Sequence, residues 1–308
     1  MVTVTDTVTA MERNSRPHRL SGALLAAALL LGAAPAAAQD LGAESRAGRV
    51  DVFMGLDFHY RDIHFNNRVF DVLANLTPGV RWNMGRRWEA TAQVILPVVN
   101  QYGDAYKRVR LGMATLSKQL LIARCWKLKA TAGLFGTDRY GLDLKNQVVI
   151  TPWLAFTAQA GFTGYWSMAT SSWQNSKMDR FTFQVGPDLY LRPWNTEVTV
   201  RGGRWVYGDN GVVGEVYRHF NHVSVGVFGA YSNKGNKDAG FKVVVMLPPY
   251  KRPQRKVCLR PASNFRLTYT VEADSYSTRT YFTDPEENER SGWFDHDLKT
   301  WGSEQMEE

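Results

Sequence analysis

Residues 50–60 read VDVFMGLDFHY, and this stretch shows the pattern that decides the fold. Apolar side chains occupy every second position, and this set of positions is called the apolar parity below. The positions between them, the polar parity, carry Asp, Gly and His together with Phe53. Alternation with a period of two is typical of a β-strand that separates an apolar from a polar environment. The apolar parity consists of Val50, Val52, Met54, Leu56, Phe58 and Tyr60, and the polar parity includes Asp51, Gly55, Asp57 and His59.

The same period recurs along most of the chain, and no segment with helical periodicity stands out after residue 39. In 70–82 the polar parity includes Arg81, and in 125–134 it includes Lys127 and Lys129. We therefore expect about twelve strands. They cover residues 50–60, 70–82, 88–96, 107–121, 125–134, 146–158, 159–168, 180–191, 196–206, 215–230, 240–247 and 264–274.

Aromatic residues often begin or end the apolar parity, as Trp82, Trp88 and Trp126 do. A transmembrane barrel has such girdles, with one wall facing lipid and the other a polar lumen. Beyond the N-terminal region no run of 18 apolar residues exists, so a membrane would be crossed by strands. The predicted fold is all-β, a transmembrane antiparallel β-barrel of about twelve strands with a short acidic C-terminal tail. A soluble β-sandwich or jelly roll also alternates and is the alternative.

An apolar run follows a basic patch near the N-terminus and ends in small residues, LSGALLAAALLLGAAPAAAQ over 20–39. This layout predicts a secretory signal peptide that is cleaved after Ala38, and an uncleaved anchor is the alternative. The predicted organisation is a signal peptide over 1–38, the barrel over 39–279 and an acidic periplasmic tail over 280–308. The expected location is the cell outer membrane.

Charge is distributed unevenly around the formal total of +8. Residues 284–308 carry nine acids against Arg290 and Lys299, a net −7, and the body over 39–283 carries +14. A basic body with an acidic tail indicates either two environments or a tail that docks on the body. The expected partners are membrane lipid and lipopolysaccharide, anionic polysaccharide and periplasmic proteins, and not nucleic acid.

No hydrolase, metalloprotease, phosphate-loop or EF-hand motif is present, so we predict a protein that is not an enzyme, without catalytic, cofactor-binding or metal-binding residues. His219 and His222 are three residues apart and would point to opposite faces of a strand, which argues against a shared metal. Cys125 and Cys258 match no metal or redox spacing, and two separate thiols are expected rather than one bridge.

Glu197 and Arg201 share the polar parity of one expected strand, as Lys127 and Lys129 do of another. If this face lines a lumen, the four side chains either tune the passage of ions or saccharides or form ordinary salt bridges within the lumen.

Residues 261–295 read PASNFRLTYTVEADSYSTRTYFTDPEENERSGWFD, and LPPYKR precedes them at 247–252. These stretches resemble the C-terminal block of short YjbH-type proteins of Bacteroidetes. The resemblance implies an outer-membrane β-barrel associated with export or assembly of exopolysaccharide, and it implies no catalytic residue. A general porin or small-solute channel is the first alternative function, and a soluble secreted β-sandwich that binds polysaccharide is the second.

Overall fold

The structure is a computed structural model that describes residues 48–62, 70–101, 107–123, 125–151, 153–168, 173–220, 223–235, 237–246, 256–262, 264–270 and 279–286. The chain divides into two compact units, Met1–Ala38 and Gln39–Glu308. All described residues belong to the second unit, so the predicted signal peptide over 1–38 lies outside them.

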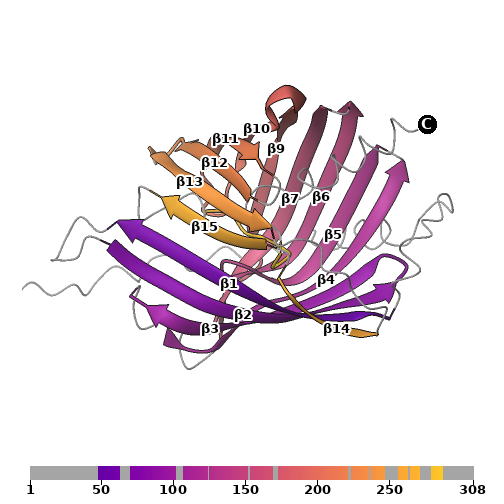
Figure 1. Ribbon diagram of the computed structural model, residues 1–308, viewed down its shortest axis with the longest axis vertical. Helices are drawn as coiled ribbons and strands as arrows, with labels where there is room; N and C mark the ends of the chain where they lie inside the picture. The colour runs from indigo at the N-terminus through magenta and orange to yellow at the C-terminus, as the bar shows by residue number, and fades with distance from the viewer. Residues whose placement is uncertain are drawn as a thin grey trace, which may run out of the picture. The chain divides into compact units, whose positions relative to one another are not determined.

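Thirteen strands of the second unit form a closed ring (Figure 1). Each pairs with its neighbours in the order β1-β15-β13-β12-β11-β10-β9-β7-β6-β5-β4-β3-β2, and β2 pairs with β1 to close the ring. The ring strands are β1 (Val50–Asp62), β2 (Phe70–Gly85), β3 (Trp88–Asn100), β4 (Arg110–Ala123), β5 (Trp126–Phe135), β6 (Arg139–Thr151), β7 (Leu154–Ser167), β9 (Arg180–Leu191), β10 (Thr196–Arg204), β11 (Asn210–His219), β12 (Val223–Ser232), β13 (Lys237–Met246) and β15 (Asn264–Thr270).

Two further strands lie beside the ring. The short β8 (Gln174–Asn175) pairs with the end of β7, and β14 (Val257–Pro261) pairs with the first part of β1. β14 and β15 use the same edge of β1, and between them the Ala262 N–H donates to the carbonyl of Met54 at 2.8 Å. They therefore act as one interrupted closing strand.

The predicted all-β barrel is confirmed, with a ring of thirteen strands rather than about twelve. The difference arises at 215–230, where one strand was expected and a hairpin is observed. The Phe220 N–H donates to the carbonyl of Val223 at 2.7 Å and closes that turn. Because successive strands of the ring alternate in direction, an odd number makes the closing pair of β1 and β15 parallel, and every other ring pair is antiparallel.

The strand break predicted at 158/159 is wrong, because β7 runs through that position and the turn lies between Thr151 and Leu154. The start of β6 was also missed. It follows a tight turn in which Thr137 and Asp138 have φ of 59° and 56°. Two consecutive residues with positive φ are typical of a type I′ hairpin. The pair Thr-Asp does not predict such a turn strongly.

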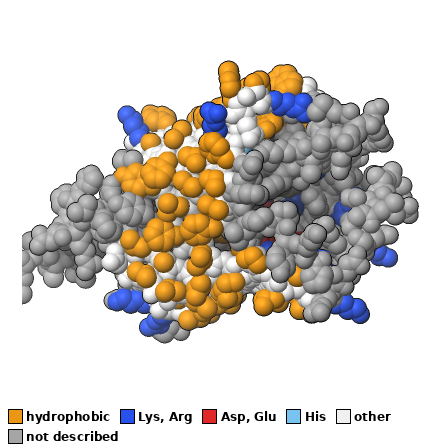
Figure 2. Space-filling view, viewed as in Figure 1, with side chains coloured by type: hydrophobic (Ala, Val, Ile, Leu, Met, Phe, Trp, Pro, Cys, Tyr) orange, Lys and Arg blue, Asp and Glu red, His pale blue; other side chains and the backbone are white. Residues whose placement is uncertain are grey.

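The two walls of the ring differ in polarity as the alternation predicts. On β1, Met54 and Leu56 are 48% and 56% exposed on the outer wall, whereas Asp51 is buried on the inner wall. On β9 the outer Phe181 is exposed and the inner Asp188 is fully buried. Hydrophobic side chains cover much of the described outer face, and Lys and Arg side chains lie toward its edges (Figure 2). The barrel is therefore apolar outside and polar inside.

The connections vary in length at both ends of the barrel. At the end where β1 begins, two to four residues separate β2 from β3, β4 from β5, β6 from β7, β9 from β10 and β11 from β12, whereas seventeen residues that include β14 separate β13 from β15. At the opposite end, seven residues separate β1 from β2 and twelve that include β8 separate β7 from β9, whereas three separate β5 from β6. Half-exposed aromatic side chains lie in or beside the short connections, namely Trp82, Trp126, Trp153, Trp194 and Phe220. In the described residues, no helix is long and apolar enough to span a membrane.

Candidate functional site

Residues 279–286, called the lumen segment below, lie against the inner wall of the barrel. With thirteen strands, β15 ends at the end of the barrel opposite to the start of β1. The lumen segment begins near that far end, where the Val206 N–H donates to the carbonyl of Arg279 at 3.1 Å. It reaches toward the near end, where Glu286 meets Arg260 of β14. Eight extended residues span at most about 26–29 Å, enough to run through most of the lumen.

At the far end, Arg279 is anchored by a buried ion pair. Its Nη1 lies 2.5 Å from Oδ2 of Asp209, in the connection between β10 and β11. The same carboxylate oxygen accepts a hydrogen bond from the Ser232 hydroxyl at 2.9 Å. Both Arg279 and Asp209 are almost completely buried, so this pair fixes where the segment enters the lumen.

Between Arg279 and Asp284, the lumen segment is held by hydrogen bonds and close packing. The Tyr281 hydroxyl donates to Oδ1 of Asp143 at 2.7 Å, and its ring stacks on Phe135 with centroids 5.4 Å apart. The Gly136 N–H donates to the carbonyl of Phe282 at 3.0 Å. Burial raises the pKa of Tyr281 well above its ordinary value, and the Asp143 charge raises it further. The phenol is therefore neutral at physiological pH.

Two glycines of the wall leave space for these rings. A Cβ at Gly161 would lie 1.7 Å from the Tyr281 hydroxyl oxygen, and one at Gly136 would lie 2.3 Å from the Phe282 ring. Contacts that short cannot be accommodated without displacing the ring. The wall sequence is thus matched to the side chains of the segment.

The second half of the lumen segment is held by ion pairs. Asp284 pairs with Arg81 of β2, and Nζ of Lys129 on β5 lies 3.4 Å from Asp284 Oδ2. Glu286 accepts two hydrogen bonds from Arg260, at 2.5 Å and 2.6 Å, and lies 3.1 Å from Arg81. Burial alone would raise the pKa of Asp284, but the Arg81 and Lys129 charges outweigh it and hold that pKa well below its usual range.

The wall itself positions these cations. Arg260 lies 3.4 Å from Asp51 on β1, and its guanidinium lies 5.3 Å from the centroid of the Phe53 ring. Gly79 makes room for that ring, since a Cβ there would be 2.3 Å from it. Arg81 lies 3.7 Å from Glu89 of β3. The cations are thus held partly by contacts that do not involve the segment.

Other inner-wall charges pair within the wall. Arg201 lies 2.6 Å from Asp188, and Lys242 lies 2.8 Å from Glu215. Glu197 pairs with His219 at 2.9 Å rather than with Arg201. Of the two interpretations of Glu197 and Arg201, salt bridging in the lumen is the one the geometry supports.

His219 also contacts the Ser224 hydroxyl at 2.7 Å, which completes a carboxylate–imidazole–hydroxyl chain with Glu197. Ser224 has no exposed surface, and His219 and Ser224 face each other across the β11–β12 pair. We therefore assign this chain to bracing the hairpin. His222 lies outside the described residues.

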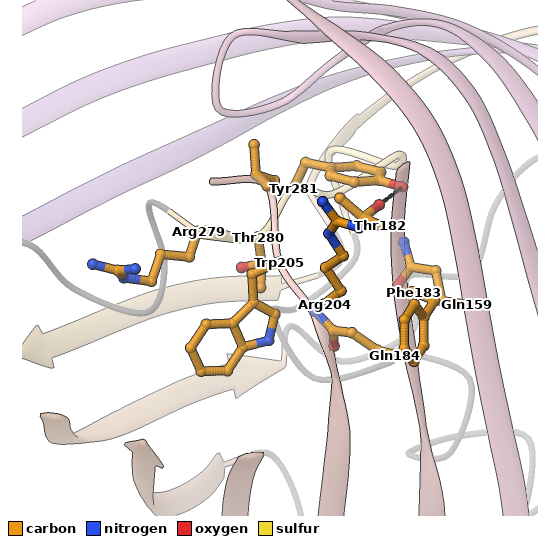
Figure 3. A pocket seen from close by; sticks show the side chains of 10 residues that line it. Gln159, Thr182, Phe183, Gln184, Arg204, Trp205, Arg279, Thr280 and Tyr281 are labelled. Atoms are coloured by element: carbon orange, nitrogen blue, oxygen red, sulfur yellow. Dashed lines mark hydrogen bonds between the residues drawn. The ribbon is translucent and has the colours of Figure 1, made fainter. Parts of the chain in front are cut away.

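A recess of about 240 Å³, including space open to solvent, lies along the seam between the lumen segment and the wall. Amide, hydroxyl, guanidinium and indole groups line it (Figure 3). Its lining includes Gln159, Thr182, Gln184, Arg204, Trp205 and Tyr281. Tyr281 and Thr182 lie 3.4 Å apart there, oxygen to oxygen.

Within the described ranges, no group of three His, Cys, Asp or Glu side chains is placed to hold a metal ion. Cys125 is exposed, Cys258 is buried on β14, and both are free thiols. No protein-family model and no curated protein matches this chain significantly. The resemblance to YjbH-type proteins stays a prediction.

Sequence reasoning found part of this site. The polar parity predicted that Asp51, Arg81 and Lys129 face inward, and a tail that docks on the body was one of the two alternatives that the charge imbalance indicated. Residues 284–286 form a turn, in which the Glu286 N–H donates to Asp284 at 3.0 Å. The boundary expected at 279/280 falls inside the lumen segment, and the division into barrel and tail stays a prediction. Residues 287–308 lie outside the described residues.

The roles of Arg260 and of the glycine spaces were missed. Arg260 lies on the short β14, which had not been predicted. A glycine in the sequence does not indicate which side chain will fill the space that it leaves. The complementary charge of body and tail was the signal available.

Proposed function

We propose that this chain is an outer-membrane β-barrel protein whose lumen is closed at rest by residues 279–286. The observation that carries the proposal is the polarity of the wall, which is apolar outside and polar inside, the reverse of a soluble protein. The contacts between the lumen segment and the inner wall support its second part. A soluble sandwich would bury its apolar parity and leave the polar one in water. Here the ionisable side chains Asp188, Glu197 and Lys242 are buried, while Val, Leu and Phe side chains are exposed.

Lipid is the solvent that suits this outer wall. Ring strands of 7 to 16 residues mostly match the length that a tilted strand needs to cross a bilayer. Five of the six connections at the end where β1 begins are short and flanked by aromatic side chains, which supports a periplasmic location for that end. Each ring strand pairs with a neighbour on either side, which satisfies its backbone groups in lipid, while β14 pairs with β1 alone.

Bacterial barrels of one chain usually have an even number of strands, which returns the chain to the periplasmic end. The odd number here would leave the C-terminal part outside. The lumen segment offsets this, because it runs back from the far end toward the end where β1 begins. This path favours a built-in closure of the lumen over a segment that happens to lie there.

A closed lumen supports a gated or accessory barrel without enzymatic activity more than a permanently open porin. Association with exopolysaccharide export or assembly is kept within the proposal, and it is carried by the resemblance of residues 247–252 and 261–295 alone. Lipid and lipopolysaccharide are the proposed partners of the outer wall.

Cell fractionation and bilayer recordings test this function. We expect the wild-type chain in the Sarkosyl-insoluble outer-membrane fraction, with a gel mobility that changes on heating. In planar bilayers it should be silent, whereas the double variant Asp284→Asn with Glu286→Gln should conduct. The control Asp179→Asn alters an exposed carboxylate beside Arg180 and should stay silent.

Recovery in the soluble periplasm would exclude the membrane barrel. A wild-type chain that conducts steadily in bilayers would instead favour the porin.

A further inference from the structure

We infer that Arg81, Lys129 and Arg260, called the cation cradle below, form a binding site for an anion that carries two or more carboxylate groups, and that Asp284 and Glu286 occupy it as internal stand-ins. The inference rests on the proposed function, since the cradle opens to a ligand only when the lumen segment leaves. It adds a class of ligand to that closed lumen.

The cradle is assembled from three separate parts of the chain. Arg81 comes from β2, Lys129 from β5 and Arg260 from β14, and they converge on two carboxylates that are separated by only one residue, Pro285. The bidentate contact of Arg260 with Glu286 at 2.5 Å and 2.6 Å matches the planar fork of a carboxylate. The geometry therefore selects a pair of closely spaced carboxylates.

The charge of the cradle favours an anion. In the ion-pair cluster around Asp284 and Glu286, four cations exceed two wall carboxylates by two charges when the lumen segment is set aside, and Lys145, directly opposite Lys129 on β6, adds a buried cation to the same wall. A partly buried cluster of like charges is costly without a counterion, so departure of the segment favours a replacement anion. The groups counted are Arg49, Arg81, Lys129 and Arg260 against Asp51 and Glu89.

Arg260 of the cradle is held in place by contacts outside the lumen segment. Arg260 is held by Asp51 and the Phe53 ring, and it also donates to the carbonyl of Pro261 at 3.1 Å. Asp51 is in turn held by Arg49 at 2.8 Å. A preorganised cation loses less conformational freedom when a ligand binds, so an external carboxylate can use the same contacts.

Calorimetric titration of the purified full chain in detergent tests the cradle, with citrate as the probe. The wild-type chain should show no binding, because its own carboxylates fill the site. The Asp284→Asn, Glu286→Gln double variant should bind citrate, and adding Arg260→Met should weaken that affinity at least tenfold. Adding Arg108→Gln, an exposed arginine, should leave it unchanged.

Each other outcome overturns the inference. Absence of citrate binding to a heat-modifiable double variant, or equal affinity with and without Arg260, would show that the cradle is not a carboxylate site. Tighter binding of phosphate than of citrate at equal ionic strength would assign the cations to phosphate esters instead. If the double variant does not form a heat-modifiable barrel, Glu286→Gln alone is titrated and the same criteria apply.

The titration needs neither a membrane nor a pore. A barrel found in the outer membrane with no citrate binding therefore refutes the cradle alone. Citrate binding by a chain recovered from the periplasm refutes the proposed location alone.

Discussion

The two halves of the lumen segment are held in different ways. Residues 279–283 are fixed by the buried Arg279–Asp209 ion pair, hydrogen bonds, ring stacking and spaces left by glycines, whereas Asp284 and Glu286 are fixed by three cations. Packing of the first kind is specific in shape, and burial shields the Arg279–Asp209 pair from salt. Ion pairs of the second kind depend on charge and can be replaced by another anion. The first half thus anchors the segment, and the second half is the part that can be released.

The largest effect is expected from loss of a cation in the second half. Arg81→Gln removes the partner that Asp284 and Glu286 share, and it leaves two buried carboxylates with fewer charges around them. Breaking a buried pair in this way costs about 3–5 kcal/mol. The second half should leave its cations, and the protein should conduct in planar bilayers.

Arg108→Gln is the matched control, because this arginine is exposed. It should remain silent. An Arg81→Gln protein that is equally silent would mean that the ion pairs do not hold the second half.

A smaller effect is expected from filling a space in the first half. Gly161→Ala places a Cβ 1.7 Å from the present position of the Tyr281 hydroxyl oxygen, which forces the ring to move. Overpacking of this kind costs about 1–3 kcal/mol. Trypsin cleavage after Arg279 should become faster, and bilayer openings should be brief rather than sustained, since the ion pairs remain.

Gly214→Ala makes the same chemical change at a position where nothing lies within 4 Å of the new Cβ. Trypsin should cleave this variant after Arg279 at the rate of the wild type. If both alanine variants cleave equally fast, Tyr281 does not depend on the space at Gly161.

The sequence predicted the wall better than the contents of the lumen, for a physical reason. Alternation is a local signal, and it correctly put Asp51, Arg81 and Asp188 on the inner wall and Val80, Trp82 and Phe181 on the outer wall. The hairpin at 219–223 was missed because HFNHV contains neither glycine nor proline. The docking of Asp284 on Arg81 joins residues 203 positions apart, and no local pattern specifies that pairing.

The halves should also respond to opposite extremes of pH. Docking lowers the pKa of Asp284, whose carboxylate faces Arg81, Lys129, Glu89 and Glu286. Its contribution is therefore present above the value of a free Asp, about 3.9, and is lost as pH falls below it toward the docked pKa.

Docking raises the pKa of Tyr281, which faces Asp143. This contribution is present below the value of a free Tyr, about 10, and is lost as pH rises through the higher docked value.

Closure should consequently show a plateau between about pH 4 and pH 10, with release on either side. The two limbs can be separated, because Tyr281→Phe removes the alkaline ionisation and Asp284→Asn removes the acidic one. Bilayer conductance of each variant is measured across the pH range and compared with that of the wild type. The difference between the two curves isolates the substituted residue from the other titrating groups of the wall. A Tyr281→Phe protein that opens at the same alkaline pH as the wild type would show that another group controls the alkaline transition. Tyr281 would then have no role in the pH response. Retention of the acidic limb in Asp284→Asn would likewise remove Asp284 from the release step and leave Glu286 as the carboxylate that controls it.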